Sequence, residues 1–314
     1  MINSKIHIVV NPVAGTGKAK RVAQSLVQKI RSNSVFDVDV TFTKEKNDAV
    51  FITRKAIAEG ASMIIAVGGD GTINEVVNGF YIDGNPIDPA CELGVLNCGT
   101  GGGFAKNLFG TKSMEQQIEI IFQPASLTMD LGCITYRDSS GRTVRRLFVN
   151  ECQTGIGSKV AEIVGKSSKI FGGTIAFGIA ATVQAIVFNP QVVKLEYDNE
   201  PFQEFRLIGL VVGNGQECAG GMKLTPDAKL NDGLFDVLSI FDMNIYRRLL
   251  SFSKVYSGKH ILAPYCSVKR CKKLKIISDS EITIEADGEV LGNSPFEIEV
   301  LPAAISVKAE NNWL

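Results

Sequence analysis

The alternation of apolar runs with helix-spaced apolar residues over the first 122 residues places the strongest constraint on the fold. Short apolar or alternating runs are typical of strands, and we expect them at residues 5–10, 36–42, 63–67 and 93–96. Between these runs the apolar side chains recur at helical spacing, over residues 18–31, 49–59, 73–80 and 114–122. Strands separated by helices predict βαβ units and a parallel sheet.

The pattern changes near Asp130, after which strands dominate and helical stretches appear only near 158–188 and 244–256. The expected strands are residues 131–136, 143–150, 192–197, 204–213, 235–241, 274–278, 282–286 and 296–301. We therefore predict an N-terminal α/β parallel-sheet domain over residues 1–130 and a β-sandwich domain over residues 131–314. We also allow for a C-terminal end of the second domain that returns to the first domain.

Composition excludes several classes of function. The 314 residues hold 33 Lys plus Arg and 33 Asp plus Glu, and this balance gives no reason to expect a nucleic-acid partner. Seven cysteines, without a CxxC pair and with only two histidines, favour reduced thiols in a cytoplasmic protein over a zinc site or a disulfide framework. Residues 170–188 carry no formal charge, but their glycine, threonine and glutamine favour a buried or membrane-facing helix over a membrane span.

The strongest motif runs from Ala66 to Glu75, where a strand enters a glycine turn and then a helix. Glycines let the backbone approach a ligand closely, and a helix N-terminus favours phosphate. Thr72 and Glu75 have the spacing of a capping box, so a tight, well-capped turn is an equally simple interpretation. Asp70 favours the phosphate interpretation, because a carboxylate there is useful when it holds Mg²⁺ or accepts a proton.

Two further loops end neighbouring strands at the same edge of the expected sheet, where open sheets bind ligands. One is the glycine run 99–103, and the other holds Asn11, Pro12 and Gly15. The stretch 15–19 is not a Walker A loop, since it lacks the leading glycine and has Ala19 in place of Ser or Thr. No GxGxxG follows any strand, which weighs against a dinucleotide-binding dehydrogenase.

Two acidic turns complete the candidate site. The segment Glu285–Glu289 contains Asp287-Gly288, a strong hairpin signal, and its paired carboxylates also suit a general base with an electrostatic partner. The run 226–236 offers oxygen ligands such as Asp232 for a hard cation, although a plain turn before a strand explains it equally well.

In this order, the motifs resemble the diacylglycerol kinase catalytic-domain family of bacterial lipid kinases and sphingosine kinases over nearly the whole chain. The resemblance implies a phosphofructokinase- and NAD-kinase-like first domain, ATP and Mg²⁺ as cofactors, and a lipid hydroxyl as phosphate acceptor. The implied nucleotide site comprises Asn11, Pro12, Gly15, Thr43, Gly68, Gly69, Asp70, Gly71, Thr72, Asn74, Glu75, Gly99 and Thr100. Glu289 is the implied proton acceptor, with Asp287 and Asp70 beside it. Asp232 and the backbone carbonyls of Lys229 and Leu234 fall where the resemblance implies a structural Mg²⁺ site.

One departure from the family bears on activity. The family reads Gly-Thr-x-Asn-Asp where this chain has glycine at both Gly102 and Gly103, which removes a carboxylate expected in the magnesium network. We expect the remaining carboxylates to suffice. Two alternatives stay open: a kinase of a soluble acceptor, since NAD kinases share the Gly-Gly-Asp-Gly-Thr signature, and an ATP-binding regulator that has lost turnover.

A lipid acceptor predicts peripheral contact with a membrane, at the inner face of the cytoplasmic membrane. Residues 170–188, flanked by Lys166 and Lys169, are the candidate acyl-chain cavity or membrane edge. Basic clusters at 142–146 and 269–275 could bind anionic headgroups. Charged edges of solvated strands are the simpler explanation for these clusters.

Overall fold

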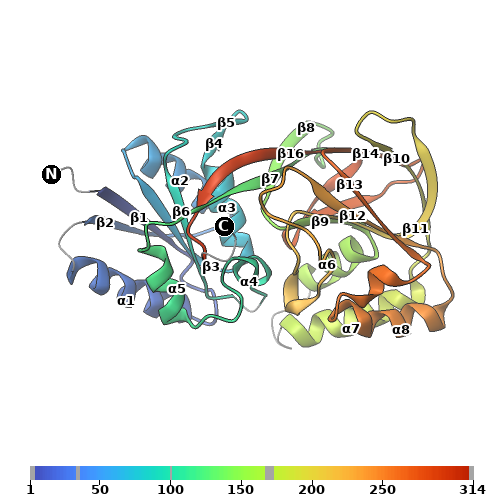
Figure 1. Ribbon diagram of the computed structural model, residues 1–314, viewed down its shortest axis with the longest axis horizontal. Coiled ribbons are helices and arrows are strands. Elements are labelled where there is room, and N and C mark those ends of the chain that lie inside the picture. Colours follow the sequence, from blue (N-terminus) through green and yellow to red (C-terminus); the bar gives the residue numbers. More distant parts are fainter. Residues whose placement is uncertain (1–3, 33–35, 100, 167–172, 311–314) are drawn as a thin grey trace. The chain divides into compact units, whose positions relative to one another are not determined.

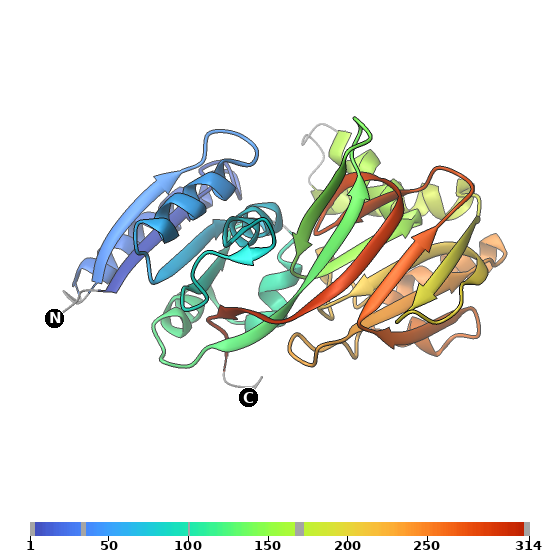
Figure 2. The ribbon, with the colours of Figure 1, turned by 90° about the horizontal axis from the view of Figure 1, so that it is seen from above.

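The computed structural model describes residues 4–32, 36–99, 101–166 and 173–310, which divide into two compact units. Unit 1 comprises Met1–Met129 and Ala303–Leu314, and unit 2 comprises Asp130–Pro302. The division falls next to the boundary expected after residue 130. The chain passes between the units in β7 (Leu127–Arg137) and in β16 (Glu289–Val307), two long strands that pair with each other (Figure 2).

Unit 1 is a parallel sheet with helices on both faces (Figure 1). The order is β2-β1-β3-β6, all parallel, and the end of β16 adds a fifth parallel strand beside β6. The elements are β1 (Ser4–Val10), α1 (Lys18–Ser32), β2 (Phe36–Phe42), α2 (Asp48–Ala58), β3 (Met63–Gly68), α3 (Asp70–Gly79), β4 (Tyr81–Ile82), β5 (Asn85–Pro86), β6 (Glu92–Asn97), α4 (Gly103–Phe109) and α5 (Met114–Ile121).

The apolar strands of unit 1 are buried on both faces, as parallel strands usually are. Ile6, Ile8 and Val10 of β1 pack with α1 and α5 in one core cluster. The helices α2 and α3 pack against each other and against β1 and β3. One boundary matters for the site: the helix expected from residue 73 begins at Asp70, so this aspartate belongs to the first turn of α3.

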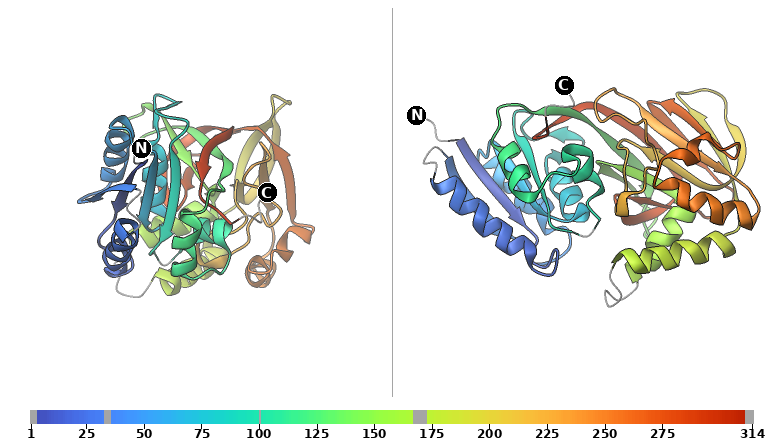
Figure 3. Two further views of the ribbon diagram at one scale, coloured as in Figure 1. Left: turned by 60° about the vertical axis from the view of Figure 1, so that its left-hand side comes forward. Right: turned by 60° about the horizontal axis from the view of Figure 1, so that its bottom comes forward.

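Unit 2 is a β-sandwich, and its described residues include three α-helices. Its strands are β8 (Thr143–Phe148), β9 (Glu151–Gly155), β10 (Gln191–Tyr197), β11 (Gln203–Gly213), β12 (Phe235–Phe241), β13 (Cys266–Cys271), β14 (Lys273–Ile277) and β15 (Thr283–Ala286), with most of β7 and β16. Its helices are α6 (Ile156–Lys166), α7 (Gly173–Val187) and α8 (Ile245–Val255), with short 3-10 turns η2 (Ala219–Gly221) and η3 (Lys259–Leu262). The helix α7 packs against α6 and α8 (Figure 3).

The sheet of unit 2 splits into two layers because individual strands change partners along their length. The first half of β11 pairs with β10 and the second half with β9, while β16 pairs first with β15 and then with β14. Apolar residues from both layers form one core cluster, in which Phe148 stacks on Phe235 with ring centroids 5.7 Å apart. The strand β13 was not expected from the sequence, and β9 is separate from β8. In the described part of the chain, no helix is long and apolar enough to cross a bilayer.

Candidate active site

The turn after β3 is built from glycines whose missing side chains let two loops touch. Gly69 is the extended N-cap residue of α3. A Cβ on Gly99 would lie 2.7 Å from the Cα of Gly69, and a Cβ on Gly68 would lie 2.5 Å from the Cβ of Thr72. Side chains would therefore force the loops apart. The result is bare backbone at the N-terminus of α3, where free N–H groups and the helix dipole favour an anion.

Asp70 connects the two glycine loops. Its Oδ2 accepts a hydrogen bond of 2.9 Å from the backbone N–H of Gly102, while its buried Oδ1 has no hydrogen-bond partner. Burial raises the pKa of this carboxyl above its ordinary value. Backbone hydrogen bonds from Gly102, Phe104 and Gly103 act in the opposite direction and lower the pKa by less than burial raises it. A buried oxygen without a hydrogen-bond partner is costly, and coordination of Mg²⁺ by this oxygen would remove that cost. This oxygen fits the cation that the resemblance implies.

The loop after β1 lies against the same turn. The amide Nδ2 of Asn11 donates to the Thr72 hydroxyl at 3.2 Å, and its Oδ1 accepts from Val13 N–H at 3.2 Å. Gly15 has a φ of 58°, and a Cβ there would lie 2.1 Å from the carbonyl oxygen of Cys98. The ends of β1, β3 and β6 therefore meet, as the sequence predicts for neighbouring parallel strands.

The other expected nucleotide residues have varied surroundings. Pro12 lies in the turn after β1, and a Cβ on Gly71 would meet open space. Thr43 is buried, and its backbone N–H donates to Val10 at 2.8 Å. Thr100 lies outside the described residues.

The capping box expected from Thr72 and Glu75 is wrong. Thr72 is the third residue of α3, and Gly69, which has no side chain, caps the helix. Glu75 instead accepts from the Ala49 N–H at 3.3 Å, at the start of α2. Asn74 is buried and accepts from the side chain of Asn78 at 3.1 Å. Glu75 therefore joins α3 to the start of α2, whereas the contact of Asn74 lies within α3.

In unit 2, Asp287 occupies the turn between β15 and β16 and is tied to the backbone. Its carboxylate accepts hydrogen bonds from Val149 N–H at 2.8 Å, Asn150 N–H at 3.0 Å and Glu151 N–H at 3.2 Å. Only 9% of Asp287 is exposed, and its φ of 48° is unusual for a residue with a side chain. These contacts make Asp287 the residue that holds the hairpin against the turn between β8 and β9.

Glu289, at the start of β16, remains partly accessible. Its Oε2 lies 3.1 Å from a guanidinium nitrogen of Arg146 on β8, and the two side chains are 26% and 17% exposed. The contact with Arg146 orients the carboxylate of Glu289. Of the acidic side chains in this hairpin, Glu289 is therefore better placed to meet a substrate than Asp287.

Sequence reasoning did not assign a role to Glu285, although it lies in the same acidic segment. Glu285 is 1% exposed, its Oε1 accepts from Gly288 N–H, and its Oε2 has no hydrogen-bond partner. Burial raises the pKa of this carboxyl to about 7. In the ladder between β9 and β15, Glu285 lies opposite Gln153, a lining residue of the cavity described below.

The expected structural metal site is occupied by protein contacts. Asp232 accepts from Leu234 N–H at 3.2 Å through Oδ1, and its Oδ2 pairs with Arg270. Lys229 is exposed and Leu234 is half-buried. Among the described residues, no cluster of three or more acidic, histidine or cysteine side chains could hold a metal. In this arrangement Asp232 does not fit a cation unless Arg270 moves away.

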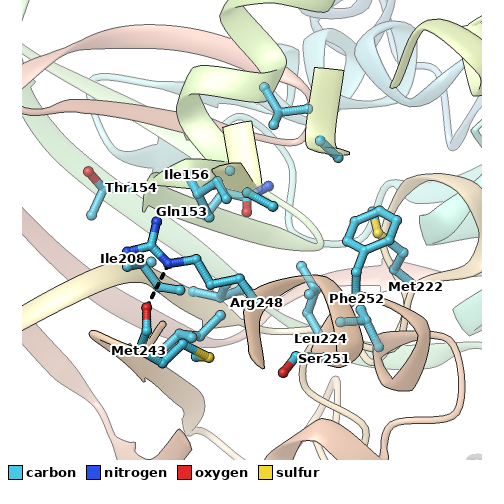
Figure 4. A pocket seen from close by; sticks show the side chains of 18 residues that line it. Gln153, Thr154, Ile156, Ile208, Met222, Leu224, Met243, Arg248, Ser251 and Phe252 are labelled. Carbon is cyan, nitrogen blue, oxygen red and sulfur yellow. Dashed lines mark hydrogen bonds between the residues drawn. The ribbon is translucent and has the colours of Figure 1, made fainter. Parts of the chain in front are cut away.

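An apolar cavity of about 130 Å³ lies within unit 2, beneath α6, α7 and α8 (Figure 4). Its walls are almost entirely aliphatic and aromatic, and include Ile156, Val160, Ala181, Ala185, Ile208, Met222, Leu224 and Phe252. Arg248 also lines it, but its guanidinium donates to the carbonyls of Met243 and Phe188 and to Asp242. Of the segment 170–188 proposed as an acyl-chain cavity, Ala181 and Ala185 line the wall, whereas residues 170–172 lie outside the described residues.

Comparison with known proteins assigns both units. The profile of the diacylglycerol kinase catalytic domain matches residues 5–134, and that of the YegS C-terminal NAD kinase beta sandwich-like domain matches residues 150–309. The chain belongs to the diacylglycerol kinase catalytic-domain family. This confirms the resemblance and the fold class expected from the sequence.

Relatives in this lipid kinase family align along most of the chain. The diacylglycerol kinase of Staphylococcus carnosus is 28% identical over 294 residues, which cover 94% of this chain and 91% of that protein. The diacylglycerol kinase of Staphylococcus saprophyticus is 26% identical, covering 99% and 97%. A crystal structure of a diacylglycerol kinase from Bacillus anthracis superposes with a TM-score of 0.71 at 22% identity, covering 99% and 98%.

A more distant solved structure shares the fold. The NAD kinase of Archaeoglobus fulgidus, solved in complex with ATP, superposes with a TM-score of 0.51 at 13% identity and covers 98% of this chain and 95% of its own. At this identity the likeness shows the fold alone.

The glycines at positions 102 and 103, where this chain departs from the family, allow close packing of the second glycine loop. Gly102 has a φ of 63°, and a Cβ there would lie 2.3 Å from the side-chain nitrogen of Asn97. Its N–H is the donor to Asp70, and Gly103 begins α4. The glycines therefore let the second loop close tightly on Asp70.

Proposed function

We propose that this protein transfers the γ-phosphate of ATP to a hydroxyl group of diacylglycerol or a related lipid. The observation that carries the choice of a lipid acceptor is the apolar cavity beneath α6, α7 and α8. A polar acceptor such as a nucleotide would leave its hydrogen-bonding groups unpaired against these walls, whereas a hydrocarbon chain would lose nothing there. Engineered apolar cavities of about 150 Å³ hold benzene, so a cavity of this size accommodates a short stretch of an acyl chain.

The nucleotide half of the reaction is assigned to unit 1. The N-terminus of α3 and the bare backbone at Gly69 and Gly99 suit the phosphates of ATP. Asp70 would hold Mg²⁺ through its unpartnered Oδ1. When bound, the ion neutralises the charge of the β- and γ-phosphates. Asn11 and Thr72, hydrogen-bonded to each other, keep the first loop in place beside the turn.

The acceptor half is assigned to unit 2. In this proposal Glu289 takes the proton of the lipid hydroxyl, because its carboxylate is partly exposed and oriented by Arg146. Asp287 is then a positioning residue, since three backbone N–H groups occupy its oxygens. This division of roles assigns one base where the sequence left three candidates.

The test is transfer of radiolabelled γ-phosphate from ATP to diacylglycerol and related lipids in mixed micelles with Mg²⁺. Asp70→Asn and Glu289→Gln are each expected to lower kcat by about 100-fold or more, as loss of a charge-stabilising or proton-transfer group does. The exposed carboxylates Asp37 and Glu204 supply matched controls, and Asp37→Asn and Glu204→Gln should leave kcat unchanged. Circular dichroism and ATP binding show whether each variant is folded.

The outcomes separate the alternatives. Near-parental turnover in both Asp70→Asn and Glu289→Gln would refute the assignment of the site. Phosphate transfer to a soluble acceptor but to no lipid would favour the NAD-kinase-like alternative. Tight ATP binding without transfer to any acceptor would favour the regulator, with the loop at Gly102 and Gly103 as the cause.

A further inference from the structure

The helices α7 and α8, with the short segment that follows α8, carry an unusual concentration of exposed apolar side chains. We define the α7–α8 face by ten of them: Ile179, Val183, Ile186, Val187, Ile245, Tyr246, Leu249, Leu250, Tyr256 and Leu262. They are ten of the nineteen large apolar side chains that are exposed among the described residues. Tyr246 is 81% exposed and Leu250 is 69% exposed, and no residue of α8 is buried. An apolar cluster of this kind marks an interaction surface.

The most exposed residues of the α7–α8 face, Tyr246 and Leu250, lie on the side of α8 away from the cavity. Ala181 and Ala185 of α7, and Ser251 and Phe252 of α8, line the cavity. Helical spacing then turns Val183 and Leu250 outward. The two helices pack against each other and lie side by side (Figures 1 and 3).

The segments that carry this face contain basic residues but no acidic residue. No Asp or Glu occurs between Glu162 and Glu196 or between Asp242 and Asp279, and these segments contain α7, α8 and η3. Arg247, Lys254 and Lys259 are exposed beside the apolar side chains. Apolar side chains flanked by cations, without any acid, complement an anionic lipid surface.

The same charge pattern argues against a second copy of the chain as the occupant. A symmetric dimer places each patch against its own copy. Arg247 and Lys254 of one copy would then meet cations of the other, with no carboxylate on the face to pair with them. An anionic bilayer supplies the missing negative charge.

The basic clusters at 142–146 and 269–275 are less suited to bind anionic headgroups, because acidic side chains already pair with them. Arg145 lies 2.6 Å from Glu299, Lys269 lies 2.6 Å from Glu200 and Lys275 lies 2.9 Å from Glu196. These pairs neutralise the clusters locally.

We propose that the α7–α8 face docks on the surface of a bilayer that contains anionic phospholipid. Docking brings the helices that cover the apolar cavity into contact with the bilayer, from which an acyl chain can enter. The source of the substrate rests on the proposed lipid kinase function, but docking itself is measured without turnover.

The experiment is flotation of the full chain with phosphatidylglycerol vesicles and with neutral phosphatidylcholine vesicles. The parent protein is expected to partition at least tenfold more strongly onto the anionic vesicles. Tyr246→Asp and Leu250→Asp should each lower this binding at least tenfold, because each places a negative charge at the docked surface. Phe51→Asp on α2 is the matched control, since Phe51 is 66% exposed but lies in unit 1, and it should bind as the parent does.

A second variant tests the charge contribution separately. Arg247→Gln with Lys254→Gln should weaken binding to anionic vesicles by roughly thirtyfold, from about fivefold per cation near an anionic surface. The same variant should change binding to neutral vesicles by less than about twofold, since the surface potential that attracts the cations is absent there.

Three results would overturn the proposal: equal binding of the parent to both vesicle types, flotation of Leu250→Asp like the parent, or a dimer in solution that Leu250→Asp dissociates. Asp70→Asn distinguishes this proposal from the proposed function, because it should float normally while it transfers no phosphate. A parent protein that floats but phosphorylates no lipid defeats only the kinase proposal. One that phosphorylates micellar lipid but does not float defeats only the docking proposal.

Discussion

Replacing the buried Glu285 by glutamine should remove a pH dependence from the stability of unit 2. Burial raises the pKa of Glu285 from 4.5 to about 7. Between these values the native protein holds a proton that the unfolded chain has released, so the free energy of unfolding falls as the pH rises through this window. At about 1.4 kcal/mol per unit of pKa, the total loss is about 3 kcal/mol, most of which falls between pH 5 and pH 8.

The variant Glu285→Gln keeps an acceptor for Gly288 N–H but has no carboxyl to ionise. A unit of about 170 residues changes its Tm by roughly 3 °C per kcal/mol. Between pH 5 and pH 8 the parent should therefore lose about 7 °C relative to the variant. The assay is calorimetry of both proteins at a series of pH values, followed at the transition of unit 2.

The matched control is Glu204→Gln, which changes an exposed carboxylate on β11 of the same unit. Its pH dependence of Tm should match that of the parent. If Glu285→Gln shows the same slope as the parent between pH 5 and pH 8, the buried carboxylate does not gain a proton on folding, and the reasoning is refuted.

Two further predictions concern the cavity and the hairpin. Ala181→Phe should raise the KM for long-chain diacylglycerol about tenfold or more while it spares a short-chain analogue, because the ring takes up most of the cavity. The exposed neighbour Thr182→Phe is the control, and equal effects on both lipids would contradict the acyl-chain role. Asp287→Asn should lower the free energy of unfolding by about 2–3 kcal/mol, since three backbone N–H groups lose a charged acceptor. Urea titration measures this, and a change below about 0.5 kcal/mol would show that Asp287 does not hold the hairpin.

The architecture of unit 1 could be predicted from the sequence, because its strands are apolar on both faces and its helices have clear apolar periodicity. The start of α3 could not be predicted from the sequence, because the glycines around Asp70 suggest a loop. Helix propensity also does not indicate that the first turn of a helix faces a ligand. The contact between Gly69 and Gly99 depends on sheet geometry that joins positions thirty residues apart. The sequence could therefore suggest the glycine loops but not the unpartnered Oδ1 of Asp70.

Unit 2 was harder to predict because partner changes along β11 and β16 leave no local signature. The strand β13 escaped notice because Lys269 and Arg270 suggested a surface cluster, and Cys271 is its one fully buried residue. The cavity could not be predicted from the sequence either, because the residues that line it come from strands and helices spread over a hundred residues. The acidic hairpin at Asp287-Gly288 was predicted, but the separate contacts of Asp287, Glu289 and Glu285 depend on β8 and β9.

The return of the chain to unit 1 has a consequence for the order in which the protein can fold during synthesis. Ser306 and Val307 form the strand beside β6, Lys308 pairs with Glu92 at 3.0 Å, and the Tyr81 hydroxyl donates to the carbonyl of Ala304. About 170 residues of unit 2 leave the ribosome before this segment does, which takes roughly 10–30 s. During that interval β6 is an open edge that other chains can pair with. For the same reason, residues 1–129 expressed alone would lack the strand that closes their sheet.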